Sequence, residues 1–210
     1  MQSTGFDGGY MNYFTADTHF FHKSLIHDRI FSNRDFLCVE EMNEQVMDAW
    51  NEVVCDQDTV YHLGDIALVD GKTKAYEKVD RLLKSLNGQI VFVKGNHDSR
   101  AMFKYLEKHN ATLQNARKKY LFNDVGLILK FDKKQFFLTH YPLIVGNKGN
   151  RINLHGHIHR STVNLSTCLN VGIDSPEADY LMGERSFGQP FSETEILKMI
   201  KAKRDDFGKR

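Results

Sequence analysis

Short apolar runs that stop abruptly at polar or glycine-bearing segments constrain the fold of this chain most. Met11–Ala16, Thr59–Leu63 and Gln89–Lys94 are rich in β-branched or aromatic residues, which predicts three strands. Between the last two, apolar residues recur at helical spacing over 75–86, and Asn87-Gly88 supplies a helix stop. Such alternation is typical of an α/β fold, in which helices cover a sheet, or of a closely related mixed sandwich.

The second half of the chain has a different pattern. Val125–Phe131 and Gln135–Thr139 predict a hairpin, and two more strands are expected near Ile152–Leu154 and Thr162–Val171. This half should therefore form a mainly antiparallel or mixed sheet. Ser192, with a glutamate three positions later, fits the capping box of a final helix.

Length and composition favour one domain and narrow the class of protein. A chain of 210 residues suits a single domain, predicted over 11–210, behind a glycine-bearing flexible extension at 1–10. Twenty-eight basic and 27 acidic residues produce no overall field that would draw the protein onto nucleic acid or a membrane. No apolar stretch is long enough to span a bilayer, and three scattered cysteines argue against a disulfide framework. We therefore expect a cytoplasmic protein without a membrane partner.

Residues able to bind divalent cations cluster just after the apolar runs. In open α/β sheets, ligands bind beyond the carboxyl ends of strands, because loops from separate strands converge there. Five loops could therefore meet at one site. The candidate ligands are Asp17, His19, Asp65, Asn96, His140, His157 and His159.

The spacing of these residues suits two ions better than one. In Asp17-Thr18-His19, side chains two positions apart on an extended turn point to the same side and can grip one ion. Asp65 has two oxygens with which to bridge two cations, and Asn96 offers a neutral oxygen. Seven ligands are too many for one zinc ion. Each fragment alone is more typical of a surface turn, so the prediction rests on their order behind successive strands.

The ordered set Asp-x-His, Gly-Asp, Gly-Asn-His-Asp, a lone His and Gly-His-x-His resembles the calcineurin-like metallophosphoesterase superfamily, especially its small bacterial and phage members. The resemblance covers Met11 to about Asp174 and implies a four-layer αββα sandwich of two mixed sheets flanked by helices. It also implies two divalent metal ions, with manganese expected and iron, zinc, nickel or cobalt as alternatives. Such members often have glycine where this chain has Phe21, which leaves the shape of the first loop open.

The same resemblance assigns the ligands to two metals. It places Asp17, His19, Asp65 and His159 on one ion and Asp65, Asn96, His140 and His157 on the other. A hydroxide shared by the two ions would attack a phosphate ester, most simply a small phosphodiester or a nucleotide.

Several other histidines have predicted roles. His97 is the candidate general acid, with Asp98 orienting it through a hydrogen bond. His22, His62 and His155 would either contact substrate phosphate or support the ligands, the supporting role being favoured. His27 and His109 are expected on exposed helix surfaces.

Two other functions remain open at this point. A non-catalytic interaction module on the same fold is expected to lack a ligand or the motif histidine, and this chain lacks neither. A nuclease needs a basic track beside the site, for which the candidates are 117–120 and 198–210. A solvated helix face and a frayed tail explain these segments more simply. The glycine-containing connection 140–151 is expected to form a mobile rim that selects substrates.

Overall fold

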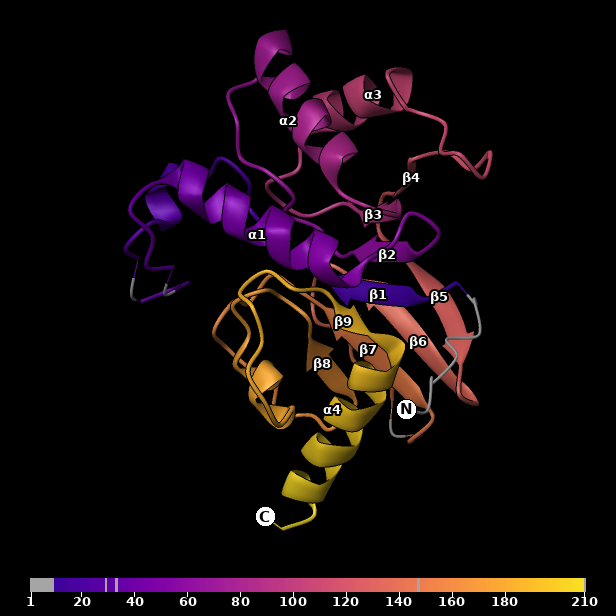
Figure 1. The fold of residues 1–210 in the computed structure, drawn as a ribbon. Coiled ribbons are helices and arrows are strands. Elements are labelled where there is room, and N and C mark those ends of the chain that lie inside the picture. The colour runs from indigo at the N-terminus through magenta and orange to yellow at the C-terminus, as the bar shows by residue number, and fades with distance from the viewer. Residues whose placement is uncertain (1–9, 29, 33, 147, 210) are drawn as a thin grey trace, which may run out of the picture.

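The computed structural model describes residues 10–28, 30–32, 34–146 and 148–209. Two mixed sheets form its centre (Figure 1). The predicted extension at 1–10 lies outside the described residues except for Tyr10, which is exposed. No helix within the described ranges is long and apolar enough to cross a membrane.

The first sheet has the strand order β4-β3-β2-β1-β9. Its strands β1 to β4 are parallel, and only β9 runs antiparallel, against β1. A parallel arrangement brings the carboxyl ends of consecutive strands to one edge, which positions the loops described below. The strands are β1 (Asn12–Thr15), β2 (Thr59–His62), β3 (Gln89–Val93), β4 (Tyr120–Asn123) and β9 (Phe191–Ser192).

The second sheet has the order β5-β6-β7-β8. As predicted, β5 (Gly126–Phe131) and β6 (Lys134–Thr139) form an antiparallel hairpin. They are followed by the parallel strands β7 (Arg151–His155) and β8 (Cys168–Asn170). The expected strand Thr162–Val171 is shorter than predicted, because backbone bonds from Leu165 to Val163 and from Cys168 to Leu165 form turns in its first half. The predicted fold class, two mixed sheets with flanking helices, is confirmed.

Three helices cover the outer face of the first sheet (Figure 1). They are α1 (Val39–Val53), α2 (Thr73–Ser85) and α3 (Arg100–Lys108), with a short 3-10 turn, η1 (Lys23–Leu25), before them. Trp50, Leu83 and Phe92 are among the buried side chains of this layer. The sequence predicted α2 but not the extent of α1 and α3. His27, predicted in a helix, instead follows η1 in a left-handed conformation with φ 64°, and His109 caps α3.

The second core lies between the two sheets and includes the last helix, α4 (Glu193–Phe207). Phe14 and Val93 from the first sheet pack with Phe136 and Leu154 from the second. The predicted capping box is present, with Ser192 and Glu195 bonded reciprocally. Near the other end of α4, the Lys203 ammonium is buried and lies 2.6 Å from Glu177 on the 3-10 turn η2 (Pro176–Tyr180). This ion pair ties α4 to the chain beside β8.

Candidate metal centre

Five loops that follow β1, β2, β3, β6 and β7 bring the predicted ligands together. Asp17 and Asp65 follow β1 and β2, Asn96 follows β3, His140 directly follows β6, and His157 comes two residues after β7. The first three of these strands are neighbours in one sheet, and the last two are neighbours in the other. The loops from both sheets therefore lie together at one end of the sandwich.

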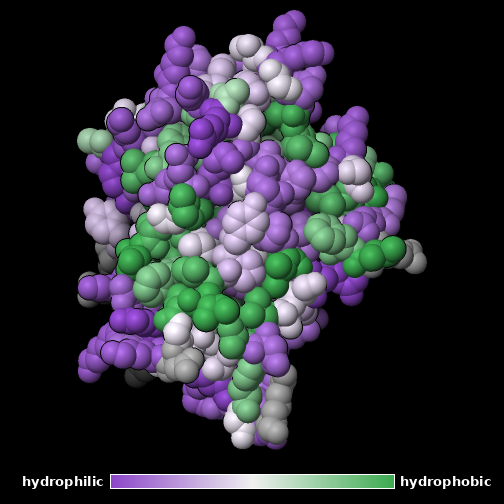
Figure 2. Space-filling view, turned by 180° about the vertical axis from the view of Figure 1, so that it is seen from behind, coloured by the Kyte–Doolittle hydropathy of each residue, from purple (hydrophilic) through white to green (hydrophobic). Residues whose placement is uncertain are grey.

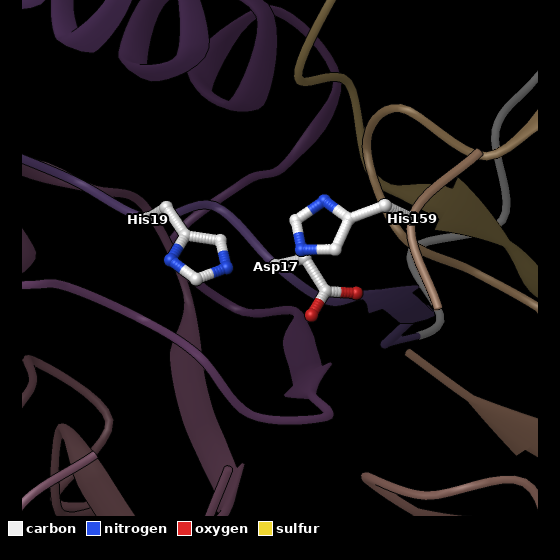
Figure 3. A group of neighbouring side chains, drawn as sticks. All are labelled: Asp17, His19 and His159. Atoms are coloured by element: carbon white, nitrogen blue, oxygen red, sulfur yellow. The ribbon is translucent and has the colours of Figure 1, made fainter. Parts of the chain in front are cut away.

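One group consists of Asp17, His19 and His159, whose candidate ligand atoms all lie within 4.8 Å of one another. All three residues are buried. Figure 3 shows the rings of His19 and His159 turned toward one another, with the Asp17 carboxylate next to the His159 ring. One oxygen and two nitrogens around a common space form a suitable partial ligand set for a borderline divalent cation.

The second group consists of Asp65, His140 and His157, with ligand atoms within the same 4.8 Å limit. The amide oxygen Oδ1 of Asn96 lies 2.8 Å from His140 Nε2 and 2.9 Å from His157 Nδ1. Nδ1 of His140 lies 2.8 Å from the Leu63 carbonyl, and donating to it fixes the tautomer that leaves Nε2 free to bind a metal. All four residues of the predicted second ligand set are thus close together.

Asp65 lies between the two groups. Its Oδ2 is 3.6 Å from His19 Nε2 and 3.5 Å from His140 Nε2. Its Oδ1 accepts a 2.8 Å hydrogen bond from the backbone N–H of His97, which fixes the carboxylate in this orientation. A single oxygen therefore faces one histidine of each group.

The chemical state of these side chains fits cation binding. His19 Nε2 is buried and has no hydrogen-bond partner, an arrangement that costs free energy unless another group satisfies the nitrogen. Burial lowers the pKa values of His19, His140 and His157, which keeps the rings neutral, as metal ligation requires. Burial and the charges of Asp174 and Asp65 raise the pKa of Asp17 well above its usual value. A divalent cation would relieve this concentration of negative charge.

Arg34 and Asp174 support the first group, and the sequence analysis overlooked both. Asp174 Oδ2 lies 2.8 Å from His159 Nδ1 and accepts a 2.9 Å hydrogen bond from the fully buried Arg34 guanidinium. Arg34 also donates to the backbone carbonyls of Asp17 and Thr18. Asp174 therefore sets the tautomer of His159, while Arg34 holds the loop that carries Asp17. Asp174 lies just inside the stretch that matched the motif pattern, but no motif marks it or Arg34.

Asp98 differs from its predicted role as a partner of the His97 ring. Its two oxygens accept three backbone N–H bonds, from Asp65, Ile66 and Gly95, at 2.8–2.9 Å. Among the contacts of the described residues, none joins the Asp98 carboxylate to the His97 ring. Burial raises the pKa of Asp98 to about 6, against the lowering effect of these bonds. Asp98 thus holds the loops after β2 and β3 together.

The three histidines predicted to contact substrate or support ligands occupy different environments. His22 is half-buried, and its Nδ1 lies 3.1 Å from Nδ1 of His19. His62 and His155 are almost completely buried, with hydrogen bonds to the Thr18 hydroxyl and the Gly156 carbonyl respectively. Burial lowers the pKa of His62 to about 3 and those of His22 and His155 to about 4. Only His22 is placed where a substrate could reach it.

The backbone of the site is unusual, because five of the seven predicted ligands have positive φ. The angles are 58° at Asp17, 49° at His19, 57° at Asp65, 72° at His157 and 45° at His159. A non-glycine residue in this left-handed region costs of order 1–3 kcal/mol, and such residues cluster at functional sites.

Phe21, the residue that left the shape of the first loop open, is also left-handed, with φ 66°. The first loop therefore keeps a conformation that suits glycine. Its backbone N–H donates to Asn43 of α1, and its ring packs against the helical layer, two contacts that offset the strain.

The family comparison agrees with this geometry. Residues 13–199 match the model of the calcineurin-like phosphoesterase family. The chain belongs to this family. Over 136 residues, the chain is 39% identical to an uncharacterized protein of Methanocaldococcus jannaschii, a match covering 63% of this chain and 74% of the relative.

Two further similarities extend the comparison. Over 86 residues, the chain is 35% identical to the gene 66 protein of Mycobacterium phage L5, covering 41% of this chain and 39% of that protein. The crystal structure of a protein of unknown function from Aquifex aeolicus has the same fold, with a TM-score of 0.62 and 23% identity. That match covers 91% of this chain and all of the Aquifex chain.

Proposed function

We propose that this phosphoesterase is a two-metal phosphodiesterase that hydrolyses small phosphodiesters or nucleotides. The position of Asp65 is the observation that carries the proposal. Its Oδ2 faces His19 Nε2 at 3.6 Å and His140 Nε2 at 3.5 Å, the arrangement expected of a ligand shared by two neighbouring cations. Family membership and the two clusters support phosphoester hydrolysis, and the preference for diesters is our inference.

The proposed ligand sets share Asp65. Asp17, His19, Asp65 and His159 would hold one ion, and Asp65, Asn96, His140 and His157 the other. When bound, two such ions would neutralise phosphate oxygens and increase the acidity of a water molecule. Nitrogen and oxygen ligands suit manganese, which we propose as the activating metal, and also suit iron, zinc, nickel and cobalt.

His97 is the proposed general acid. Its side chain is exposed, and its ring centroid lies 5.3 Å from that of His19 and 5.9 Å from that of His22. An imidazolium there can donate a proton to a departing alkoxide as the ester bond breaks. Its backbone N–H meanwhile holds Asp65 Oδ1, so the His97 ring can be altered without removing that hydrogen bond.

The test combines an activity assay with metal analysis. Purified protein loaded with manganese should hydrolyse bis(4-nitrophenyl) phosphate. We expect His97→Ala to lower kcat by about 10²–10⁴-fold with metal content retained. Asp65→Asn should lose both activity and metal. His109→Ala, which changes an exposed histidine at the end of α3, is the matched control and should behave like the parent.

Several outcomes would contradict the proposal. Full turnover in His97→Ala would remove the acid role. Inactivity of the parent with manganese, nickel and cobalt, despite bound metal, would favour a non-catalytic module.

The nuclease alternative finds little support in the two basic segments. Lys119 is buried and donates to the carbonyls of Leu86 and Gly88, while Arg117 donates to the Gln57 carbonyl and to the Thr59 hydroxyl at the start of β2. These residues precede β4 and so lie at the opposite edge of the sheet from the metal site. In α4, Lys203 is buried against Glu177. A steep salt dependence of nucleic-acid binding would revive this alternative.

A further inference from the structure

Two half-exposed aromatic rings lie against the candidate metal ligands, one on each group. Tyr141 is 53% exposed, and its ring centroid lies 4.6 Å from that of His157 and 5.0 Å from that of His140. Phe31 is 52% exposed, and its ring centroid lies 4.3 Å from that of His159. Each ring thus combines contact with a candidate ligand and a surface open to solvent.

Local hydrogen bonds shape the backbone beside both rings. The N–H groups of Ile30 and Phe31 donate to the Asp28 carboxylate at 2.9 and 3.0 Å. The Tyr141 carbonyl accepts a 2.6 Å hydrogen bond from the Thr139 hydroxyl. These bonds define the turn that carries each ring.

Apolar side chains continue outward from both rings. Ile30 is 94% exposed beside Phe31, and Leu143 and Ile144, which follow Tyr141, are 41% and 79% exposed. Hydrophobic side chains also gather over the β5–β6 side of the face in Figure 2, so exposure of apolar residues alone does not mark a binding site. Phe31 and Tyr141 differ from the others because their rings touch the predicted ligands.

We propose that Tyr141 and Phe31 form aromatic walls on either side of the metal centre, which bind aryl or nucleobase substituents of a phosphodiester. The substrate class would then be diesters with aromatic groups rather than simple alkyl esters. This inference rests on the proposed function, because it places the phosphate at the two metal clusters. Faces of aromatic rings stack on planar groups, whereas an alkyl ester gains little from them.

A binding experiment tests the walls without requiring turnover. Methylphosphonate and phenylphosphonate share a phosphonate group and differ by the ring, so calorimetry on manganese-loaded protein isolates the aromatic contribution. We expect phenylphosphonate to bind about fivefold to tenfold more tightly, in line with measured aromatic pair energies. That preference should fall to about twofold or less in Tyr141→Ala or in Phe31→Ala, with methylphosphonate affinity retained.

An activity experiment then separates the two substituents of a diester. Bis(4-nitrophenyl) phosphate and methyl 4-nitrophenyl phosphate have the same leaving group, so the ratio of their kcat/KM values reports on the group that stays. Either Tyr141→Ala or Phe31→Ala, whichever removes the ring that stacks on the group that stays, should lower this ratio about tenfold. Tyr141→Phe, which keeps a ring, should retain it. Ile128→Ala, at an exposed apolar position on β5, is the control for loss of apolar surface.

The outcomes separate this inference from the proposed function. Equal binding of the two phosphonates by the parent, or an unchanged preference in both alanine variants, would overturn the aromatic walls even if the enzyme is active. A protein that prefers phenylphosphonate through Tyr141 or Phe31 but hydrolyses no ester would keep the walls and refute the phosphodiesterase.

Discussion

Replacing Asp174 with asparagine should weaken one metal site and leave the other nearly unchanged. Asp174 Oδ2 is 2.8 Å from His159 Nδ1, whereas His140 in the other group is oriented by the backbone carbonyl of Leu63, also at 2.8 Å. Asparagine has nearly the same shape but no charge, so it weakens the partner of His159 without opening a cavity. Loss of such a partner typically costs 10–100-fold in metal affinity, or about 1.4–2.7 kcal/mol.

The structure also defines what else Asp174→Asn does. The buried Arg34 guanidinium loses its charged partner but keeps its hydrogen bonds to the carbonyls of Asp17 and Thr18. Removing one partner of a buried pair typically costs about 3–5 kcal/mol of stability, so folding must be checked by circular dichroism before metal is measured. Asp179→Asn, at an exposed position on η2, is the matched control.

Competition with a graded series of chelators would measure the two metal equivalents separately. We expect one equivalent to bind 10–100-fold more weakly in Asp174→Asn and the other to change by less than about threefold. An equal loss from both equivalents would show that Asp174 acts through general stability rather than through His159. No loss from either, in a folded variant, would refute the orienting role.

Three further predictions follow from buried contacts. Gly95→Ala should lose metal, because an added Cβ would lie 2.2 Å from Asp65 Oδ1 and force the shared ligand to move. Gly71→Ala is the control and should keep its metal, because the nearest atom to an added Cβ there is 3.6 Å away. Metal analysis of both purified variants is the measurement. Lys203→Met should cost about 3–5 kcal/mol in urea unfolding, and Lys201→Met, which breaks an exposed pair on the same helix, less than about 1. Burial raises the pKa of Glu177 and the Lys203 charge lowers it, so removing Lys203 should raise this pKa further. A carboxyl whose pKa is raised in the folded state contributes stability that is lost as pH rises. The loss of unfolding free energy in Lys203→Met should therefore be larger at about pH 8 than at about pH 5, and an equal loss at both would contradict the pairing.

The sequence predicted the positions of the strands and the loops they lead into better than it predicted the supporting structure. Strand endings are visible because β-branched and aromatic runs give way to glycine and polar residues, as after Val93 and after His62. The order of the candidate ligands along the chain then indicated a common site, since parallel strands end at one edge of a sheet. Both inferences use local patterns whose spatial consequence is fixed by strand geometry.

Arg34 and Asp174 could not be found in this way, because their importance comes from contacts between distant segments. The two residues are 140 positions apart and meet only in the folded chain. A lone arginine or aspartate in a sequence carries no spacing signal, and surface positions are usual for both residue types. The same reason applies to Asp98, which adjoins His97 in sequence but points its carboxylate at three backbone N–H groups.

The packing of the site explains why glycine is needed at two of the motif positions. A Cβ on Gly156 would lie 2.4 Å from Asp17 Oδ2, just as one on Gly95 would meet Asp65. In both cases the backbone of one loop rests against the carboxylate of another, and for Gly156 the next residue, His157, donates its N–H to Asp17 at about 3 Å. The ligands are therefore held by the loops that pack on them as well as by their own backbone. The strained, left-handed conformations at Asp17 and Asp65 persist because neighbouring loops leave each carboxylate one position to occupy.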